Sequence, residues 1–272
     1  MEVHCFGSGS GGNAFLLRSD RAAILVDAGF TPSMLRRALR ACGVRDHELS
    51  AIVITHEHRD HVRGLTGLLR WHSCPVLATD GTFRALRVDW MRRTRLVAGQ
   101  SLEVGDLVIL PIATAHDANE PIGLRVTAPR ASLALFTDLG SVTPEVIDAL
   151  QTATLVVLEA NHDPMLLATG PYPAWLKRRI ASPVGHLSND QAAHAAAHLS
   201  PAVQMLWLAH LSEENNRPEL AVGTVRERLR DAGGVPVFPL PPRGLVTWKA
   251  GASSCPLPLV YPMPSPRKEV TG

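Results

Sequence analysis

An apolar segment that runs directly into a cluster of histidines limits the possible folds of this chain more than any other feature. The segment AIVIT (51–55) is typical of a strand, and HEHRDH (56–61) follows it at once. A strand that enters a tight loop presents alternate side chains and then wraps, so donors in the loop can converge on one point. Neutral imidazole and carboxylate are ligands for zinc, manganese or iron. The candidate ligands here are His56, His58, Asp60 and His61.

The alternative interpretation of this segment is a charged surface loop after a strand. We favour the metal site because active sites of α/β proteins collect at the carboxyl ends of strands, where this segment lies.

The order of the predicted elements favours an α/β (α+β) fold with two sheets covered by helices over one doubly wound sheet. Strands are expected at 2–6, 14–18, 22–26, 51–55, 75–78, 107–112, 122–127, 132–136, 154–158, 203–209 and 244–248. Helices are expected at 31–42, 62–72, 144–151, 173–180, 189–199 and 218–232. No linker divides residues 1–250, so we predict one domain there. Prolines interrupt 251–272, which predicts an irregular or disordered tail.

The string THEHRDH (55–61) resembles the HxHxDH signature of the metallo-β-lactamase superfamily, and the other residues of that signature follow in order. Each of them stands at the carboxyl end of a predicted strand: His116, Asp138 and His210. The resemblance implies a four-layer αββα sandwich, the metallo-β-lactamase fold. It also implies a metal-dependent hydrolase with two divalent ions, which would be zinc, manganese or iron.

The resemblance also assigns the ligands. His56, His58 and His116 would bind one ion, Asp60, His61 and His210 the second, and Asp138 would bridge both. Two such ions activate a water as hydroxide and stabilise charge on the attacking and leaving oxygens of a phosphodiester. Asp60 would in addition accept the proton of the water. Asp27 matches the aspartate of the first motif of the superfamily, which anchors the metal loop.

The tripeptide His-Leu-Ser begins at residues 186, 198 and 210, and its three histidines have different predicted roles. His186 precedes Ser188 and Gln191, which form a capping box at the start of a helix, where anions are attracted. His186 therefore resembles the general-acid or phosphate-contacting histidine of nucleic-acid-processing members of the superfamily. A capping-loop histidine without function is the alternative. His198 lies at the other end of that helix, where a cation is favourable, and needs no chemical role.

Several segments together look like the YycJ/WalJ group of this superfamily, described as cytoplasmic 5′→3′ DNA exonucleases. They are GSGSGGN (7–13), ITHEHRDHVRGL (54–65), LEANHD (158–163), GHLSN (185–189) and LAHLSEENNRPELA (208–221). The resemblance implies a phosphodiesterase whose partner is nucleic acid, DNA in particular. The alternatives are a small-molecule hydrolase, such as a cyclic phosphodiesterase, lactonase or thioesterase, and a non-catalytic DNA-binding module. The stretch between Asp138 and His210 is too short for the second domain that RNase J inserts there.

Candidate substrate contacts follow from position. Ser8 and Asn13 belong to the glycine-rich loop, which either cradles a phosphate or is a plain hairpin turn. Asn161 and His162 follow a predicted strand and are expected to face the metal site. Glu159, at the end of that strand, is a candidate for orienting a histidine.

Two other segments leave alternatives open. Residues 84–95 interleave five arginines with Trp90, which suits backbone contact and base stacking but equally a solvated helix face. Asn215 and Asn216 would either bind substrate or cap the helix expected at 218–232.

Composition excludes other classes of protein. Hydrophobic residues make up 46% and charged residues 19%, which argues against a disordered chain. No apolar stretch is long enough for a membrane span, and the first residues lack the pattern of a signal peptide, so the expected location is the cytoplasm. The four scattered cysteines are expected to be reduced thiols. The net charge of +2 neither requires nor excludes a polyanionic partner.

Overall fold

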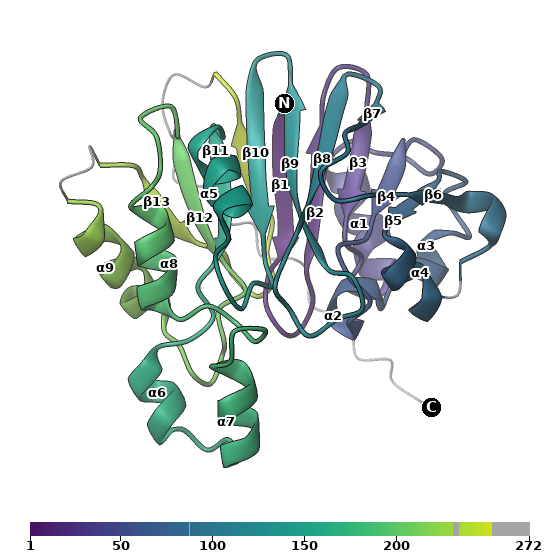
Figure 1. Ribbon diagram of the computed structural model, residues 1–272. Coiled ribbons are helices and arrows are strands. Elements are labelled where there is room, and N and C mark those ends of the chain that lie inside the picture. The colour runs from purple at the N-terminus through teal and green to yellow at the C-terminus, as the bar shows by residue number, and fades with distance from the viewer. Residues whose placement is uncertain (87, 231–233, 252–272) are drawn as a thin grey trace, which may run out of the picture.

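The structure, a computed structural model, describes residues 1–86, 88–230 and 234–251 (Figure 1). Apart from Gly251, the predicted tail 251–272 lies outside the described residues. Within them the chain forms two seven-stranded sheets that pack face to face, as expected.

In the first sheet the strands run in the order β14 (Val246–Lys249), β1 (Glu2–Gly7), β2 (Ala14–Arg18), β3 (Ala23–Val26), β4 (Ala51–Val53), β5 (Val76–Ala78) and β6 (Arg93–Arg95). In the second sheet the order is β13 (Val237–Pro239), β12 (Met205–Ala209), β11 (Leu155–Glu159), β10 (Ala131–Phe136), β9 (Ile122–Ala128), β8 (Leu107–Ala113) and β7 (Leu102–Val104). Strands β3 to β6 are parallel, and so are β10 to β13. The carboxyl ends of each parallel set therefore meet at one edge of their sheet.

The helices form two groups along the chain, one between the strands of each sheet. The first group is α1 (Pro32–Ala41), α2 (Arg59–Val62), α3 (Leu65–Leu68), α4 (Asp80–Ala85) and the 3₁₀ helix η1 (Trp90–Arg92). The second group is α5 (Pro144–Gln151), α6 (Pro164–Thr169), α7 (Ala174–Ile180), α8 (Asn189–Ala196) and α9 (Pro218–Arg228).

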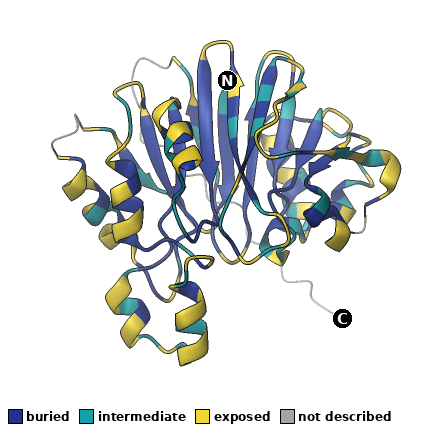
Figure 2. Cartoon of the chain, in the orientation of Figure 1, coloured by how far each residue is buried: buried dark blue, intermediate teal, exposed yellow. Residues whose placement is uncertain are grey.

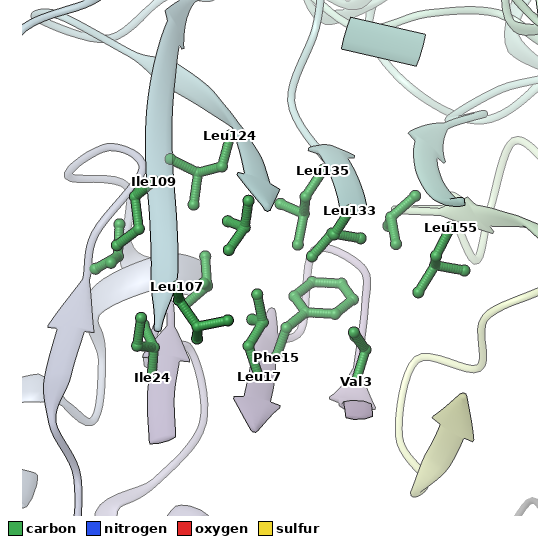
Figure 3. Close-up of a cluster of buried hydrophobic side chains, with 14 of the residues drawn as sticks. Val3, Phe15, Leu17, Ile24, Leu107, Ile109, Leu124, Leu133, Leu135 and Leu155 are labelled. Atoms are coloured by element: carbon green, nitrogen blue, oxygen red, sulfur yellow. The ribbon is translucent and has the colours of Figure 1, made fainter. Parts of the chain in front are cut away.

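Alternation along the strands builds the core between the sheets. In β2, Phe15 and Leu17 point to the inner core, whereas Ala14 and Leu16 join the cluster on the outer face. The second sheet alternates in the same way and supplies Leu124, Leu133, Leu135 and Leu155 to the inner core (Figure 3). Two sheets that are apolar on both faces require cover on their outer sides.

Helices supply this cover on each outer face. Leu35 and Leu39 of α1 pack on the first sheet, and Val146 of α5 and Val225 of α9 pack on the second. Figure 2 shows the same arrangement, with buried strands and helices whose outward faces are exposed. The expected αββα layering is therefore confirmed.

The elements absent from the sequence-based expectation are short or exposed. Strand β6 reads Arg-Thr-Arg and pairs in parallel with β5, although no apolar pattern marks it as a strand. Residues 84–95, for which one alternative was a solvated helix face, instead comprise the end of α4, η1 and β6 around residue 87, which lies outside the described part. The helix expected at 62–72 is split, because α2 ends at Val62 and α3 begins at Leu65.

Two expectations about the environment can be compared with the described residues. None of their helices combines the length and apolar character that a bilayer span requires. Cys5, Cys42 and Cys74 are buried and free, and burial raises the pKa of the Cys5 thiol to about 12. Cys255 lies outside the described residues.

Candidate metal centre

The seven candidate ligands come together at the carboxyl ends of the strands. His56 follows β4, Asp60 and His61 lie in α2, and His116, Asp138 and His210 follow β8, β10 and β12. Their donor atoms form overlapping groups in which all ligand atoms lie within 4.8 Å of one another. The groups are His56, His58 and His116; His56, His61 and Asp138; Asp60, His61 and His210; and Asp138, Glu159, His186 and His210.

The first group is oriented by hydrogen bonds to the Nδ1 atoms of two histidines. The Thr55 hydroxyl donates its single proton to Asp27, so it accepts from His56 Nδ1 at 3.1 Å. His116 Nδ1 donates to the carbonyl of Gly185 at 2.9 Å. Both imidazoles therefore present Nε2 to the site as a lone pair, and His116 Nε2 lies 3.3 Å from His58 Nδ1.

The group of Asp60, His61 and His210 is held in place through Asp27, which binds His61. The buried carboxylate of Asp27 accepts from His61 Nδ1 at 2.8 Å and from the backbone N–H of Thr55 at 2.9 Å. His61 Nε2 then points toward Asp60, with 3.4 Å to Asp60 Oδ2. Asp60 Oδ2 also lies 3.4 Å from His210 Nε2. Asp27 thus accepts hydrogen bonds from residues 55 and 61 of the metal loop, and its role as the anchor of this loop stays a prediction.

Asp138 lies between the group of His56, His58 and His116 and the group of Asp60, His61 and His210. Its Oδ2 is 3.0 Å from His61 Nε2, and its Oδ1 is 3.6 Å from His116 Nε2. Burial opposes ionisation of Asp138, but the imidazoles of His210 and His61 outweigh it and hold the pKa well below its usual range. An ionised carboxylate in this position is suited to contact two cations.

The donor atoms of the site fit divalent metal ions. Among the described residues, His56 Nε2 and His210 Nε2 are buried and make no hydrogen bond. Burial also holds the pKa of His56 well below its ordinary value, so its imidazole is neutral. A buried polar atom that has no hydrogen-bond partner costs free energy unless a bound ligand satisfies it. These His and Asp clusters are therefore consistent with a dinuclear metal site.

Glu159 connects the cluster to His186. One oxygen, Oε1, accepts from the Nδ1 atoms of both His186 and His210 at 2.8 Å. The other, Oε2, accepts from the backbone N–H groups of Leu139 and Leu187. Burial opposes the charge on Glu159, but His186 and His210 together outweigh it and lower the pKa of this carboxyl. Glu159 thus accepts hydrogen bonds from two histidines at once, and its role in orienting them stays a prediction.

The predicted substrate contacts are more deeply buried than their roles require. The Ser8 hydroxyl accepts from the backbone N–H of His210 at 3.0 Å and donates to Asn13 Oδ1 at 2.9 Å. Asn13 Nδ2 in turn lies 3.3 Å from Asp60 Oδ2. Asn161 Nδ2 donates to the carbonyl of His210 at 2.9 Å, and His162 is buried beside Ser188. These side chains brace the cluster, and direct substrate contact stays a prediction.

The remaining candidates lie outside the cluster. Asn216 exchanges hydrogen bonds with Asn189, and its Oδ1 accepts from the backbone N–H of Arg217. Asn215 is buried within the same turn. His198, which follows the end of α8, is exposed and belongs to none of the groups of metal-binding donors in the described chain.

Sequence reasoning did not identify three contributors to the site. Thr55 stands inside the recognised motif and links Asp27 to His56, so its position was available as a signal. Asp117 follows His116 directly, and its Oδ1 lies 3.4 Å from His116 Nε2. Arg179, which pairs with Asp117 from α7, has no local signal because the two residues are far apart in the chain.

A close approach of backbone at Gly29 fixes the metal loop, which leads to a first prediction. A Cβ atom at Gly29 would lie 1.7 Å from the carbonyl oxygen of Asp60 and 2.5 Å from the amide nitrogen of Asn13. We expect Gly29→Ala to displace α2, reduce bound metal and lower the free energy of unfolding by about 1–3 kcal/mol. Metal analysis and denaturant unfolding measure both effects. Gly11→Ala is the matched control, because nothing lies within 4 Å of its added Cβ; equal behaviour of the two variants would contradict the prediction.

Fold and site together define a class of protein. Residues 22–210 match the family model described as the beta-lactamase superfamily domain, and the chain belongs to the metallo-β-lactamase superfamily. It is a metal-dependent hydrolase of this fold.

Two curated proteins are similar to most of this chain. Exodeoxyribonuclease YycJ of Bacillus anthracis is 34% identical over 232 residues, which cover 83% of this chain and 88% of that protein. Exodeoxyribonuclease WalJ of Streptococcus pneumoniae serotype 2 (strain D39) is 35% identical over 233 residues, 83% of this chain and 87% of that protein.

Solved structures show the same fold. The metallo-β-lactamase fold protein YhfI from Bacillus subtilis has a TM-score of 0.70 at 19% identity and covers 91% of this chain and 99% of its own. Zn²⁺-bound PqqB from Methylobacterium extorquens has a TM-score of 0.67 at 16% identity, with 92% and 100% covered. At these identities the two structures support the fold and not a particular substrate.

Proposed function

We propose that this protein is a metal-dependent phosphodiesterase that degrades DNA from the 5′ end. The observation that carries the proposal is His186, which Glu159 holds beside the cluster of metal-binding donors. Its side chain is partly exposed, unlike that of Glu159. Similarity to exodeoxyribonucleases over most of the chain supports DNA as the substrate.

The proposed ligand assignment follows the groups of donors. His56, His58 and His116 would hold one ion, Asp60, His61 and His210 the other, and Asp138 would contact both. Bound divalent ions would polarise a phosphoryl oxygen and stabilise the charge that develops on it. Imidazole and carboxylate donors suit zinc, manganese or iron.

Three residues of the chain would move protons or position those that do. Asp60, oriented by Asn13, would accept a proton from the attacking water. His186 would donate a proton to the departing sugar oxygen. Glu159 raises the pKa of His186 against the effect of burial, which favours the protonated imidazole that this role needs.

The proposed cytoplasmic location is supported by the free thiols of Cys5, Cys42 and Cys74.

The test is digestion of end-labelled DNA, with 5′-phosphate and 5′-hydroxyl ends, in the presence of manganese or zinc. We expect mononucleotides to be released from the 5′ end. A parallel panel contains thioesters, lactones and bis-p-nitrophenyl phosphate. Turnover of a thioester or lactone together with inertness toward every nucleic acid would reject the nuclease proposal, and binding of DNA by metal-loaded protein without cleavage would indicate a non-catalytic module.

A further inference from the structure

A pair of short helices projects beyond the sheets at the edge where the site lies. Helices α6 and α7 extend below the body of the molecule in Figure 1, apart from the helices that cover the two sheets. The chain leaves the site at His162, forms this projection over residues 164–184, and returns to the site at His186. We call residues 164–184 the α6–α7 projection.

The surface of the projection is unusual for a helix pair. Trp175 is 61% exposed and Met165 is 70% exposed, which places both among the most exposed large hydrophobic side chains of the described residues. Trp175 lies at the end of α7 that is farther from the site along the chain, and Met165 at the start of α6. Aromatic side chains are the group on which nucleobases stack.

The projection also holds positive charge. Lys177, Arg178 and Arg179 lie consecutively in α7, and residues 164–184 contain no acidic residue. The net charge of the projection, +3, exceeds the formal net charge of the whole chain, +2, so the rest of the chain has a net charge of −1. Asp163 caps α6, and Arg178 is exposed and forms no ion pair with any described residue.

Contacts connect the projection to the metal centre. Arg179 pairs with Asp117, whose Oδ1 lies 3.4 Å from His116 Nε2. The backbone N–H of His186 donates to the carbonyl of Ile180, the last residue of α7, at 2.9 Å. Because Trp175 and Arg179 are four residues apart in one helix, they share a face, and Trp175 lies about one turn beyond Arg179.

Lys177 fixes the two helices to each other. Its Nζ donates to the carbonyl of Ala168 in α6 at 2.7 Å. The projection is thus a supported structure rather than an isolated loop, and Trp175 is held at a set place relative to the site.

We propose that the α6–α7 projection is the docking arm for a single-stranded segment of DNA. Trp175 stacks on a base, and Arg178, three residues further along α7, contacts a backbone phosphate. This inference rests on the proposed nuclease function. A second copy of the chain is the other candidate occupant, but the concentration of positive charge beside a phosphodiesterase site favours a polyanion.

The test measures binding of a single-stranded phosphorothioate oligonucleotide, which resists cleavage, to the metal-loaded protein by fluorescence anisotropy. We expect Trp175→Ala to raise the Kd by roughly 5- to 150-fold, the range for loss of one stacked base. Arg178→Ala is expected to reduce the slope of log K against log salt by about one phosphate contact. Hydrolysis of bis-p-nitrophenyl phosphate is expected to stay unchanged in both variants, because this substrate is too small to reach the arm.

Trp90→Ala is the comparison variant, because residues 84–95 are the other segment whose composition suits base stacking. Trp90 is 78% exposed and is followed by arginines as Trp175 is, but it lies in η1, which leads into the edge strand β6. No effect of Trp175→Ala on DNA binding, whether or not Trp90→Ala weakens it, would overturn the inference while leaving a DNA-degrading enzyme intact. A change of sedimenting mass in Trp175→Ala with normal DNA binding would assign the arm to self-association. Wild-type protein that hydrolyses bis-p-nitrophenyl phosphate but neither binds nor cuts DNA would instead reject the proposed function.

Discussion

Replacing His186 with alanine is expected to lower the turnover of DNA by roughly 10²- to 10⁴-fold, the usual scale of general acid catalysis. Bound metal should be largely preserved, because the two groups that contain His56 and the group of Asp60, His61 and His210 do not include His186. Single-turnover kinetics on end-labelled DNA, together with metal analysis of the purified variant, measures both quantities.

His198→Ala is the matched control for this prediction. His198 lies in the same Leu-Ser context but is exposed after the end of α8, so its replacement should change neither turnover nor metal content. Loss of metal in His186→Ala would show that His186 is a ligand. The group of Asp138, Glu159, His186 and His210 makes that outcome physically possible.

Removal of metal by a chelator is expected to lower the melting temperature by roughly 8–16 °C for each bound ion. At one site, an ion present at about 1,000 times its Kd stabilises the folded state by about 4.1 kcal/mol. For a domain of this size, about 1 kcal/mol corresponds to a shift of roughly 2–4 °C. Differential scanning calorimetry with and without chelator, followed by addition of zinc or manganese, measures the shift and its reversal.

Asp138→Ala tests whether the shift arises at the proposed site. Asp138 belongs to two of the groups of donors and lies between His61 and His116, so its removal should abolish most of the dependence on chelator. A full chelator-induced shift in this variant would place the stabilising metal elsewhere. The same would follow if chelation left the melting temperature of the wild-type protein unchanged.

The elements that sequence predicts well are those with a local pattern. Strand β4 and helix α1 carry apolar residues at the period of their element, and Ser188 with Gln191 forms the expected capping box. Strand β6 has no such pattern, because it is exposed and gains its place by pairing with β5. Local periodicity reports burial of one face, so an exposed edge strand gives little signal.

At the site, too, a local signal predicted some residues, whereas only the fold decided which partners they contact. Asp27 was predicted from its match to the first motif of the superfamily, and Glu159 from its place at the end of a predicted strand. That one Glu159 oxygen accepts from both His186 and His210 depends on the parallel pairing of β11 with β12. Ser8 and Asn13 were predicted as phosphate contacts from a glycine-rich loop, and the fold turns both inward against His210 and Asp60.

The sequence by itself indicated a metal-dependent hydrolase, because the HxHxDH signature and the ligand types at the ends of predicted strands are local properties that a single chain displays. The tertiary structure decided which residues form hydrogen bonds with those ligands and which side chains surround them. Ser8 reaches His210 across 202 positions of the chain, and Arg179 reaches Asp117 across 62. Such partners meet only when the two sheets pack and the α6–α7 projection folds back to Gly185, so no local pattern could specify them.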